Sequence, residues 1–292
     1  MKMIRFFAVL LIFAWFVCVA GGCAEVGGSE SPTPDILRIE NNTADPDAFI
    51  GKTISILFIG NSYTYYGDLP AQIATLAKMY GITIESTSIC PGGASLTTTK
   101  RRAIEEMENH PYDFAVFQDQ GMRPIQNSSI DFFADVHELC DAAKKNGAAP
   151  VLYNPAGAIT WLPNGGVKPN IGLQAKLTAA HEQAAAETGA VLVNAGDAWV
   201  YAYEQIPDIS LFVDNGRADS HANAEGAYFT ACVFCSTLFG LEIKDPAADN
   251  LYNGDNAVAL GQIAWEFVSY YKMVGKYPDE SFTVLPGTNE IQ

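Results

Sequence analysis

Short, mostly apolar runs alternate with longer segments of helical spacing over most of this chain, and this alternation constrains the fold more than any other feature. Such runs, bounded by turn residues, predict strands buried on both faces of a sheet. They lie at 53–59, 112–117, 150–153 and 190–194, and a further strand is expected at 82–89. Helices are expected over 69–80, 97–109, 129–145, 171–188, 223–239 and 257–272. Strands separated by helices of this length predict a parallel sheet with helices on both faces, which is a doubly wound α/β domain.

The composition favours a packed domain and argues against a nucleic-acid-binding protein. Hydrophobic residues make up 49% of the 292 residues, which is enough for a core and excludes a disordered chain. Acidic residues outnumber basic residues by 33 to 17, which gives a net charge of −16. A protein that binds nucleic acid needs cationic groups to displace counterions from phosphate, so we expect no nucleic-acid partner.

The first residues are typical of an export signal that ends at a lipid attachment site. Lys2 and Arg5 flank the start of an apolar run over 6–20, which is shorter than the roughly 20 residues that a membrane span requires. The run leads into the sequence AGGC at 20–23, which resembles a bacterial lipobox. The resemblance implies that Cys23 receives the lipid and becomes the mature N-terminus. An ordinary signal peptide cut near this point is the alternative.

Three regions are therefore expected along the chain: a lipoprotein signal peptide over 1–22, a flexible tether over 23–50 and one folded domain over 51–292. The tether is rich in Gly, Ser, Pro, Asp and Asn and lacks periodicity. We expect an exported protein, lipid-anchored to a bacterial membrane on its periplasmic or cell-surface face. Anionic headgroups would repel so acidic a surface, so the acyl chains would provide the attachment.

Four cysteines lie in the predicted domain, at positions 90, 140, 232 and 235, and they could pair in an oxidising compartment. Cys232 and Cys235 form a C-x-x-C motif in the middle of an apolar helical segment. A redox-active C-x-x-C normally lies at a helix N-terminus, where the helix dipole lowers the pKa of one thiol. We therefore predict that these two cysteines are core residues on one helix face.

Polar and glycine-rich segments follow several predicted strands. They read GNSYT at 60–64, PGGAS at 91–95 and QDQG at 118–121, and DSH at 219–221 precedes a late helix. In open parallel sheets, ligands bind at the carboxyl ends of the strands, so these segments are expected to converge. A serine, a glycine-rich turn, an amide and a histidine supply the nucleophile, oxyanion donors and base of an acyl-transfer site. The long connection 155–170 is expected to border this site.

These segments resemble the blocks of the SGNH (GDSL-type) hydrolase superfamily, in the family's order, over residues 52 to about 240. The resemblance implies a flavodoxin-like α/β/α sandwich around a five-stranded parallel sheet, commonly ordered 2-1-3-4-5. It implies that Ser62 is the nucleophile, with its own backbone N–H in the oxyanion hole. Gly93 would supply a second backbone N–H, and His221, in the well-matched pattern H-x-N-x-x-G-x-Y, would be the base.

Two positions depart from the family pattern. The family's third block is usually G-x-N-D, whereas the segment here reads QDQ. We take Gln118 as the side-chain donor to the oxyanion, with Gln120 as the alternative. The acid of the triad normally lies three residues before the histidine, and here Asp219 lies two before it. Asp219 is the predicted acid, and Asp214 and Asp119 are the alternatives.

The remaining histidines, His110, His137 and His181, are predicted at the surface. Tyr65 and Trp161 are candidates for contact with a sugar. The mechanism that the resemblance implies needs no organic cofactor and no metal ion.

The resemblance implies a serine ester hydrolase that works through an acyl-enzyme. Its expected partners are an ester substrate, with acetyl esters of carbohydrates or small molecules in first place, and the membrane reached through the N-terminal lipid. Two alternatives remain open. A glycan-binding surface lipoprotein without catalysis is favoured by the displaced acid, and an O-acyltransferase would use the same catalytic residues.

Overall fold

The computed structural model describes residues 44–126, 129–163, 166–214, 219–244 and 254–274. The chain divides into Met1–Pro32 and Thr33–Gln292, and all described residues belong to the second unit. The predicted signal peptide, Cys23 and most of the predicted tether lie outside the described residues. In the part of the chain that the structure describes, no helix is long and apolar enough to span a membrane.

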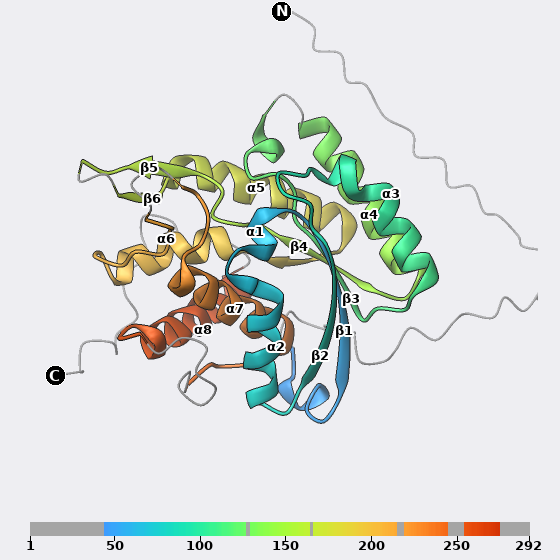
Figure 1. Cartoon of the computed structure of the whole chain (residues 1–292), viewed down its shortest axis with the longest axis horizontal. Coiled ribbons are helices and arrows are strands. Elements are labelled where there is room, and N and C mark those ends of the chain that lie inside the picture. The colour runs from blue at the N-terminus through green and yellow to red at the C-terminus, as the bar shows by residue number, and fades with distance from the viewer. Residues whose placement is uncertain (1–43, 127–128, 164–165, 215–218, 245–253, 275–292) are drawn as a thin grey trace, which may run out of the picture. The chain divides into compact units, whose positions relative to one another are not determined.

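Five parallel strands form the central sheet (Figure 1). They are β1 (Thr53–Ile59), β2 (Thr83–Ile89), β3 (Phe114–Phe117), β4 (Ala149–Tyr153) and β7 (Val191–Val193). Their order, β2-β1-β3-β4-β7, confirms the predicted fold and the order 2-1-3-4-5, with β7 as the fifth parallel strand. Ile59 pairs with Ile89 on one side and with Phe117 on the other, so three strands end level at one edge of the sheet.

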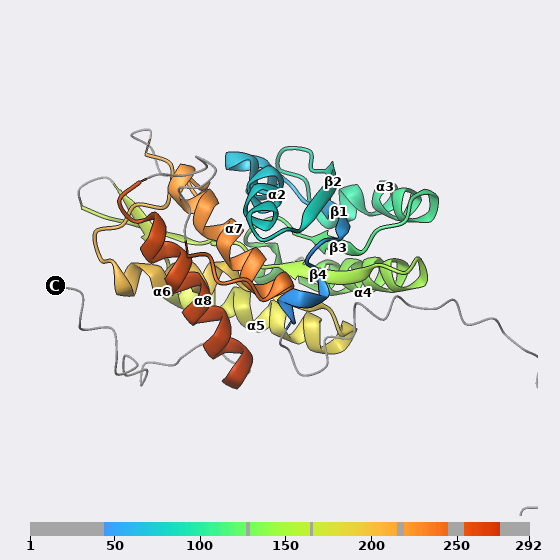
Figure 2. The ribbon, with the colours of Figure 1, turned by 90° about the horizontal axis from the view of Figure 1, so that it is seen from below.

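Helices cover both faces of this sheet (Figure 1 and Figure 2). The long ones are α2 (Leu69–Met79), α3 (Leu96–Asn109), α4 (Ser129–Lys145), α5 (Ile171–Thr188), α7 (Ala224–Phe239) and α8 (Ala257–Val274). Side chains alternate along β1: Ile56 and Phe58 pack in a core cluster with α2, α7 and α8, whereas Leu57 and Ile59 pack in another with α3 and α4. Burial on both faces explains why the strand reads as one apolar run.

Helix α6 (Ala195–Gln205) and the strand pair β5 (Ile159–Trp161) and β6 (Val167–Pro169) are among the elements that were not predicted. Helix α6 begins directly after β7, where the side chain of Asn194 accepts a hydrogen bond from the N–H of Asp197. The first eight residues of α6 are all buried. Strands β5 and β6 form a small antiparallel pair in the connection after β4.

The packed domain begins earlier than position 51. Residues 44–50, at the end of the predicted tether, include a 3₁₀ turn at Pro46–Ala48. Phe49 is buried, and its ring lies 5.3 Å from that of Phe239 in an edge-on contact. A side chain at Gly240 would collide with the carbonyl oxygen of Ala44. This segment therefore packs on the domain. The sequence analysis placed it in the tether because the residues around Phe49 are mostly polar.

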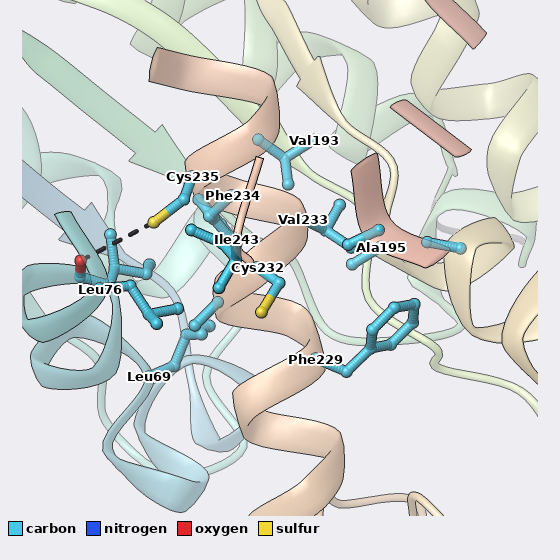
Figure 3. Packing of buried hydrophobic residues seen from close by; sticks show 14 of the residues in the cluster. Leu69, Leu76, Val193, Ala195, Phe229, Cys232, Val233, Phe234, Cys235 and Ile243 are labelled. Atoms are coloured by element: carbon cyan, nitrogen blue, oxygen red, sulfur yellow. Dashed lines mark hydrogen bonds between the residues drawn. The ribbon is translucent and has the colours of Figure 1, made fainter. Parts of the chain in front are cut away.

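The cysteines of the described residues are free thiols, and three of the four are buried. Figure 3 shows Cys232 and Cys235 on α7 among apolar side chains such as Leu69, Leu76 and Phe229. Burial raises the pKa of Cys232 to about 12. These thiols pack as core residues, as predicted for the C-x-x-C motif, and a thiol so buried is unreactive.

Candidate active site

The turn after β1 presents a serine at the edge of the sheet. Helix α1 is a single turn (Ser62–Tyr65), and the side chain of Asn61 caps it by accepting a hydrogen bond from the N–H of Tyr63 at 3.1 Å. The preceding residue must be glycine, because a Cβ at Gly60 would lie only 2.5 Å from the hydroxyl oxygen of Thr64. Glycine therefore permits the sharp strand-to-helix turn that places Ser62 against the cleft described below.

Ser62, His221 and Asp219 form a continuous chain of hydrogen bonds. Nε2 of His221 lies 2.8 Å from Oγ of Ser62, and Nδ1 lies 2.5 Å from Oδ1 of Asp219. The same carboxylate oxygen accepts the backbone N–H of His221 at 2.9 Å. With the Nδ1 proton held by the carboxylate, Nε2 is free to accept a proton from the serine hydroxyl. The arrangement has the geometry of a nucleophile, a general base and the group that orients the base.

Two tyrosines beside Ser62 hold the histidine loop in place. The hydroxyl of Tyr63 lies 2.7 Å from Oγ of Ser220, the residue between the acid and the base. The ring of Tyr66 stacks on the imidazole of His221, with centroids 4.1 Å apart and planes at 18°. The sequence interpretation did not assign these roles. The run of aromatic residues after Ser62 was the available signal, although it does not show which ring meets the histidine.

The structure separates the three candidates for the acid. Asp219 contacts the imidazole directly, and the loop absorbs the one-residue shift from the family spacing. Asp119 is buried, and its carboxylate instead pairs with the guanidinium of Arg123. Asp214 is exposed, on the segment that precedes 215–218.

Two backbone N–H groups are placed to receive an oxyanion. Among the hydrogen bonds of the described residues, none uses the N–H of Ser62 or of Gly93, and both residues line the same cleft. Gly93 has φ of +68°, a left-handed conformation that other residues rarely adopt. The amide nitrogen of Asn61 donates to the carbonyl oxygen of Ala94 at 2.8 Å and so fixes the Gly93 turn against the Ser62 turn.

The structure contradicts the prediction that Gln118 is the side-chain oxyanion donor. Gln118 is fully buried, and its Oε1 accepts the N–H of Asn61 at 3.0 Å and the hydroxyl of Thr64 at 2.9 Å. Its amide nitrogen donates to the carbonyl oxygen of Asp119. Gln118 therefore stabilises the turn that carries Ser62 from its buried side. Gln120, the alternative, is exposed and lines the cleft.

The site opens into a cleft of about 440 Å³. Its lining combines glycines with polar side chains: Asn61, Ser62, Tyr63, Gly93, Gln120, Gly121, Met122, Arg123, Gln126, Gly157, Ser220 and His221. Gly157 belongs to the connection 155–170, so the expectation that this connection borders the site is confirmed. Tyr65 and Trp161 are 45% and 60% exposed, and neither is among the residues that line the cleft.

The other histidines do not contribute to this site. His110 and His137 are exposed, as predicted, and each pairs with a glutamate. His181 is only 2% exposed, so its surface prediction is wrong: the residue lies on the face of α5 that packs against Phe132 of α4. Burial lowers the pKa of His181 to about 4. Within the described ranges, no cluster of His, Cys, Asp and Glu could hold a metal ion.

Comparisons with known proteins find relatives by structure. No family model and no curated protein matches the sequence. A protein from Slackia heliotrinireducens, provisionally described as an SGNH hydrolase, is 24% identical, with a TM-score of 0.50 over 64% of this chain and 100% of its own. A DUF4886 family protein from Bacteroides uniformis is 16% identical, with a TM-score of 0.59 over 78% of this chain and 98% of its own. At these identities the likeness concerns the fold.

Proposed function

The chain has the fold of the SGNH hydrolases, and from this premise we propose that it is a serine ester hydrolase whose nucleophile is Ser62. The observation that carries the proposal is the hydrogen-bonded chain from Ser62 through His221 to Asp219 at the mouth of a cleft. Fold likeness alone does not decide function, because one fold hosts many chemistries, whereas these three side chains supply the nucleophile, the base and the orienting acid of nucleophilic catalysis.

The proposed reaction is acyl transfer in two steps. Oγ of Ser62 attacks the ester carbonyl carbon while Nε2 of His221 takes the hydroxyl proton. The N–H groups of Ser62 and Gly93, with the side chain of Gln120, stabilise the negative oxygen of the tetrahedral intermediate. His221 then gives its proton to the departing alcohol oxygen, which leaves the acyl group on Ser62. Water attacks this acyl-enzyme, with His221 again as base, and releases the acid.

We take the substrate to be an acetyl or other short acyl ester of a carbohydrate or small molecule. The cleft is lined largely by glycines and polar side chains, with Met122 as its aliphatic member, which suits a short acyl group better than a long chain. The exposed rings of Tyr65, on α1, and of Trp161, on the connection after β4, offer apolar faces to a sugar. The surplus of acidic residues disfavours an anionic substrate.

A panel of p-nitrophenyl esters of increasing chain length, together with acetylated glycans, tests this function. The protein should cleave acetate fastest, and Ser62→Ala should lose the activity. Glycan binding without turnover by the wild type would favour the non-catalytic alternative. Acyl transfer to an added sugar that exceeds hydrolysis would favour a transferase.

A further inference from the structure

A single buried carboxylate links the two loops that border the oxyanion site. Oδ1 of Asp119 accepts the N–H of Leu96 at 3.0 Å and the N–H of Gln120 at 2.7 Å. Leu96 is the first residue of α3, directly after the turn that carries Gly93, and Gln120 lies in the loop after β3. Asp119 is 2% exposed, so neither bond competes with bulk water.

The other oxygen of this carboxylate anchors it to the body of the protein. Oδ2 of Asp119 pairs with Nη1 of Arg123. Nη2 of Arg123 donates to Asp135 at 2.9 Å and to the hydroxyl of Thr97 at 2.5 Å. Lys100 pairs with the second oxygen of Asp135 at 3.0 Å. This chain of charges joins the loop after β3 to α3 and α4.

A contribution to the stability of the fold does not readily account for these buried ion pairs. Taking charged groups out of water costs about as much as their attraction returns, so buried ion pairs are weak evidence of a stabilising role. Their clearest effect is to fix one geometry, because each displaced partner would leave a buried charge without compensation. These linked charges fix the positions of the N–H groups of Leu96 and Gln120, on the two segments that follow the Gly93 turn and β3.

Two contacts hold the segment that directly follows Gly93. The side chain of Asn61 donates to the carbonyl oxygen of Ala94, and the carboxylate of Asp119 accepts the N–H of Leu96. Resting on the proposed function, we propose that Asp119 is a positioning residue for the oxyanion hole. Its carboxylate sets the N–H of Gly93 and the Gln120 loop at the distance from Ser62 that the tetrahedral intermediate requires, and Arg123 keeps that carboxylate in place. A donor misplaced by a fraction of an ångström stabilises the oxyanion less.

The test compares Asp119→Asn and Asp119→Glu with the wild type and with Asp131→Asn. Asn removes the charge at the same size, and Glu keeps the charge but moves the oxygens by one methylene. Asp131 is the matched control, because its carboxylate is exposed and lies 4.0 Å from the same guanidinium. The measurements are kcat and KM for p-nitrophenyl acetate, the inhibition constant of a boronic acid that adds to the serine as a tetrahedral anion, and Tm.

Both Asp119 variants should lose about 10- to 100-fold in kcat, since loss of a whole donor costs about 10²–10³-fold. KM should stay within about threefold, and boronic acid affinity should fall in parallel with kcat/KM, because both report transition-state stabilisation. Asp131→Asn should match the wild type. If Asp119→Asn fails to fold, Asp119→Glu decides by the same criteria.

A folded Asp119 variant with wild-type kcat and boronic acid affinity would overturn the proposal. A loss confined to KM and Tm, with boronic acid affinity unchanged, would also overturn it by showing a purely structural role. A wild-type protein that cleaves no ester and binds no boronic acid would contradict the proposed function itself.

Discussion

At the scale of the residue, the site depends on which side chains reach one point. Ser62 and His221 could be placed from the sequence, because the end of an apolar strand and the start of a helix both lie at the carboxyl edge of the sheet. Gln118 and Gln120 could not be told apart. The two residues are two positions apart, so in a continuing strand their side chains would point to the same face. Strand β3 ends at Phe117, however, and this rule does not apply beyond its end. The turn sends Gln118 inward and Gln120 outward.

The contact between Asp219 and His221 leads to the first prediction. Asp219→Asn should keep the fold and lower kcat by orders of magnitude, as loss of the productive tautomer does in other triads, where it costs about 10⁴-fold. Asp214→Asn is the control and should retain most of the activity. Steady-state kinetics with p-nitrophenyl acetate and a melting curve measure both effects. Near-full activity in Asp219→Asn would show that the contact is not catalytic.

The two glutamines should behave in opposite ways when replaced by Met. Gln118→Met leaves the buried N–H of Asn61 and hydroxyl of Thr64 without their acceptor, at a cost of about 1–3 kcal/mol each, so Tm should fall. Gln120→Met changes an exposed side chain in the cleft, so kcat should fall with Tm unchanged. A lower Tm for Gln120→Met, with the kcat loss confined to Gln118→Met, would restore the assignment of Gln118 as the oxyanion donor.

At the scale of the element, prediction succeeded where a strand or helix has one regular pattern of burial. Helices α4 and α5 begin and end at the predicted residues, and α7 begins one residue after the expected position because Asn223 is its cap. Helix α6 was missed because only its cap, Asn194, separates it from β7, so no turn residues mark the boundary between the two elements. The surface prediction for His181 was wrong because an Ala-rich helix gives no clear sign in the sequence of which face is buried.

The buried position of His181 predicts an acid-sensitive packing of α5 on α4. Its pKa is about 4 in the folded protein and 6.5 for the ordinary side chain, and desolvation is the cause. Below 6.5 the unfolded chain binds a proton that the folded protein does not, so the free energy of unfolding should decrease as the pH falls from 6.5 towards 4. The loss is at most about 3 kcal/mol. Urea titrations across this range measure it.

His181→Met removes the titration and should flatten this part of the pH profile. His110→Gln is the control, because His110 is exposed at the end of α3, and it should leave the slope unchanged. An equal slope in the wild type and in His181→Met would assign the acid sensitivity to other groups.

At the scale of the whole molecule, the doubly wound fold could be predicted because strands alternate with helices and short connections limit the topology, whereas the strand order was implied by the resemblance to the SGNH hydrolases. The start of the domain could not, since Phe49 is a single apolar ring within a polar segment. Export and lipid attachment remain proposals that rest on the segment 1–23.

Mass spectrometry of the N-terminal peptide of the mature protein tests that proposal. We predict that the protein made in a bacterial host begins at Cys23 with a diacylglyceryl group, and that Cys23→Ser remains unlipidated. Acyl chains rather than charge should hold the protein, so high salt should not release it from membranes. A free amino terminus at another residue would contradict the prediction.

The most direct test of the central claim is covalent labelling of the wild-type protein by a fluorophosphonate, mapped by peptide mass. The account predicts one modified residue, Ser62, because only a serine activated by a neighbouring base attacks such a probe quickly. Labelling should be far slower in His221→Ala and absent in Ser62→Ala. Equal labelling of Ser62→Ala, or no labelling of the folded wild type, would contradict the claim that Ser62 is an activated nucleophile.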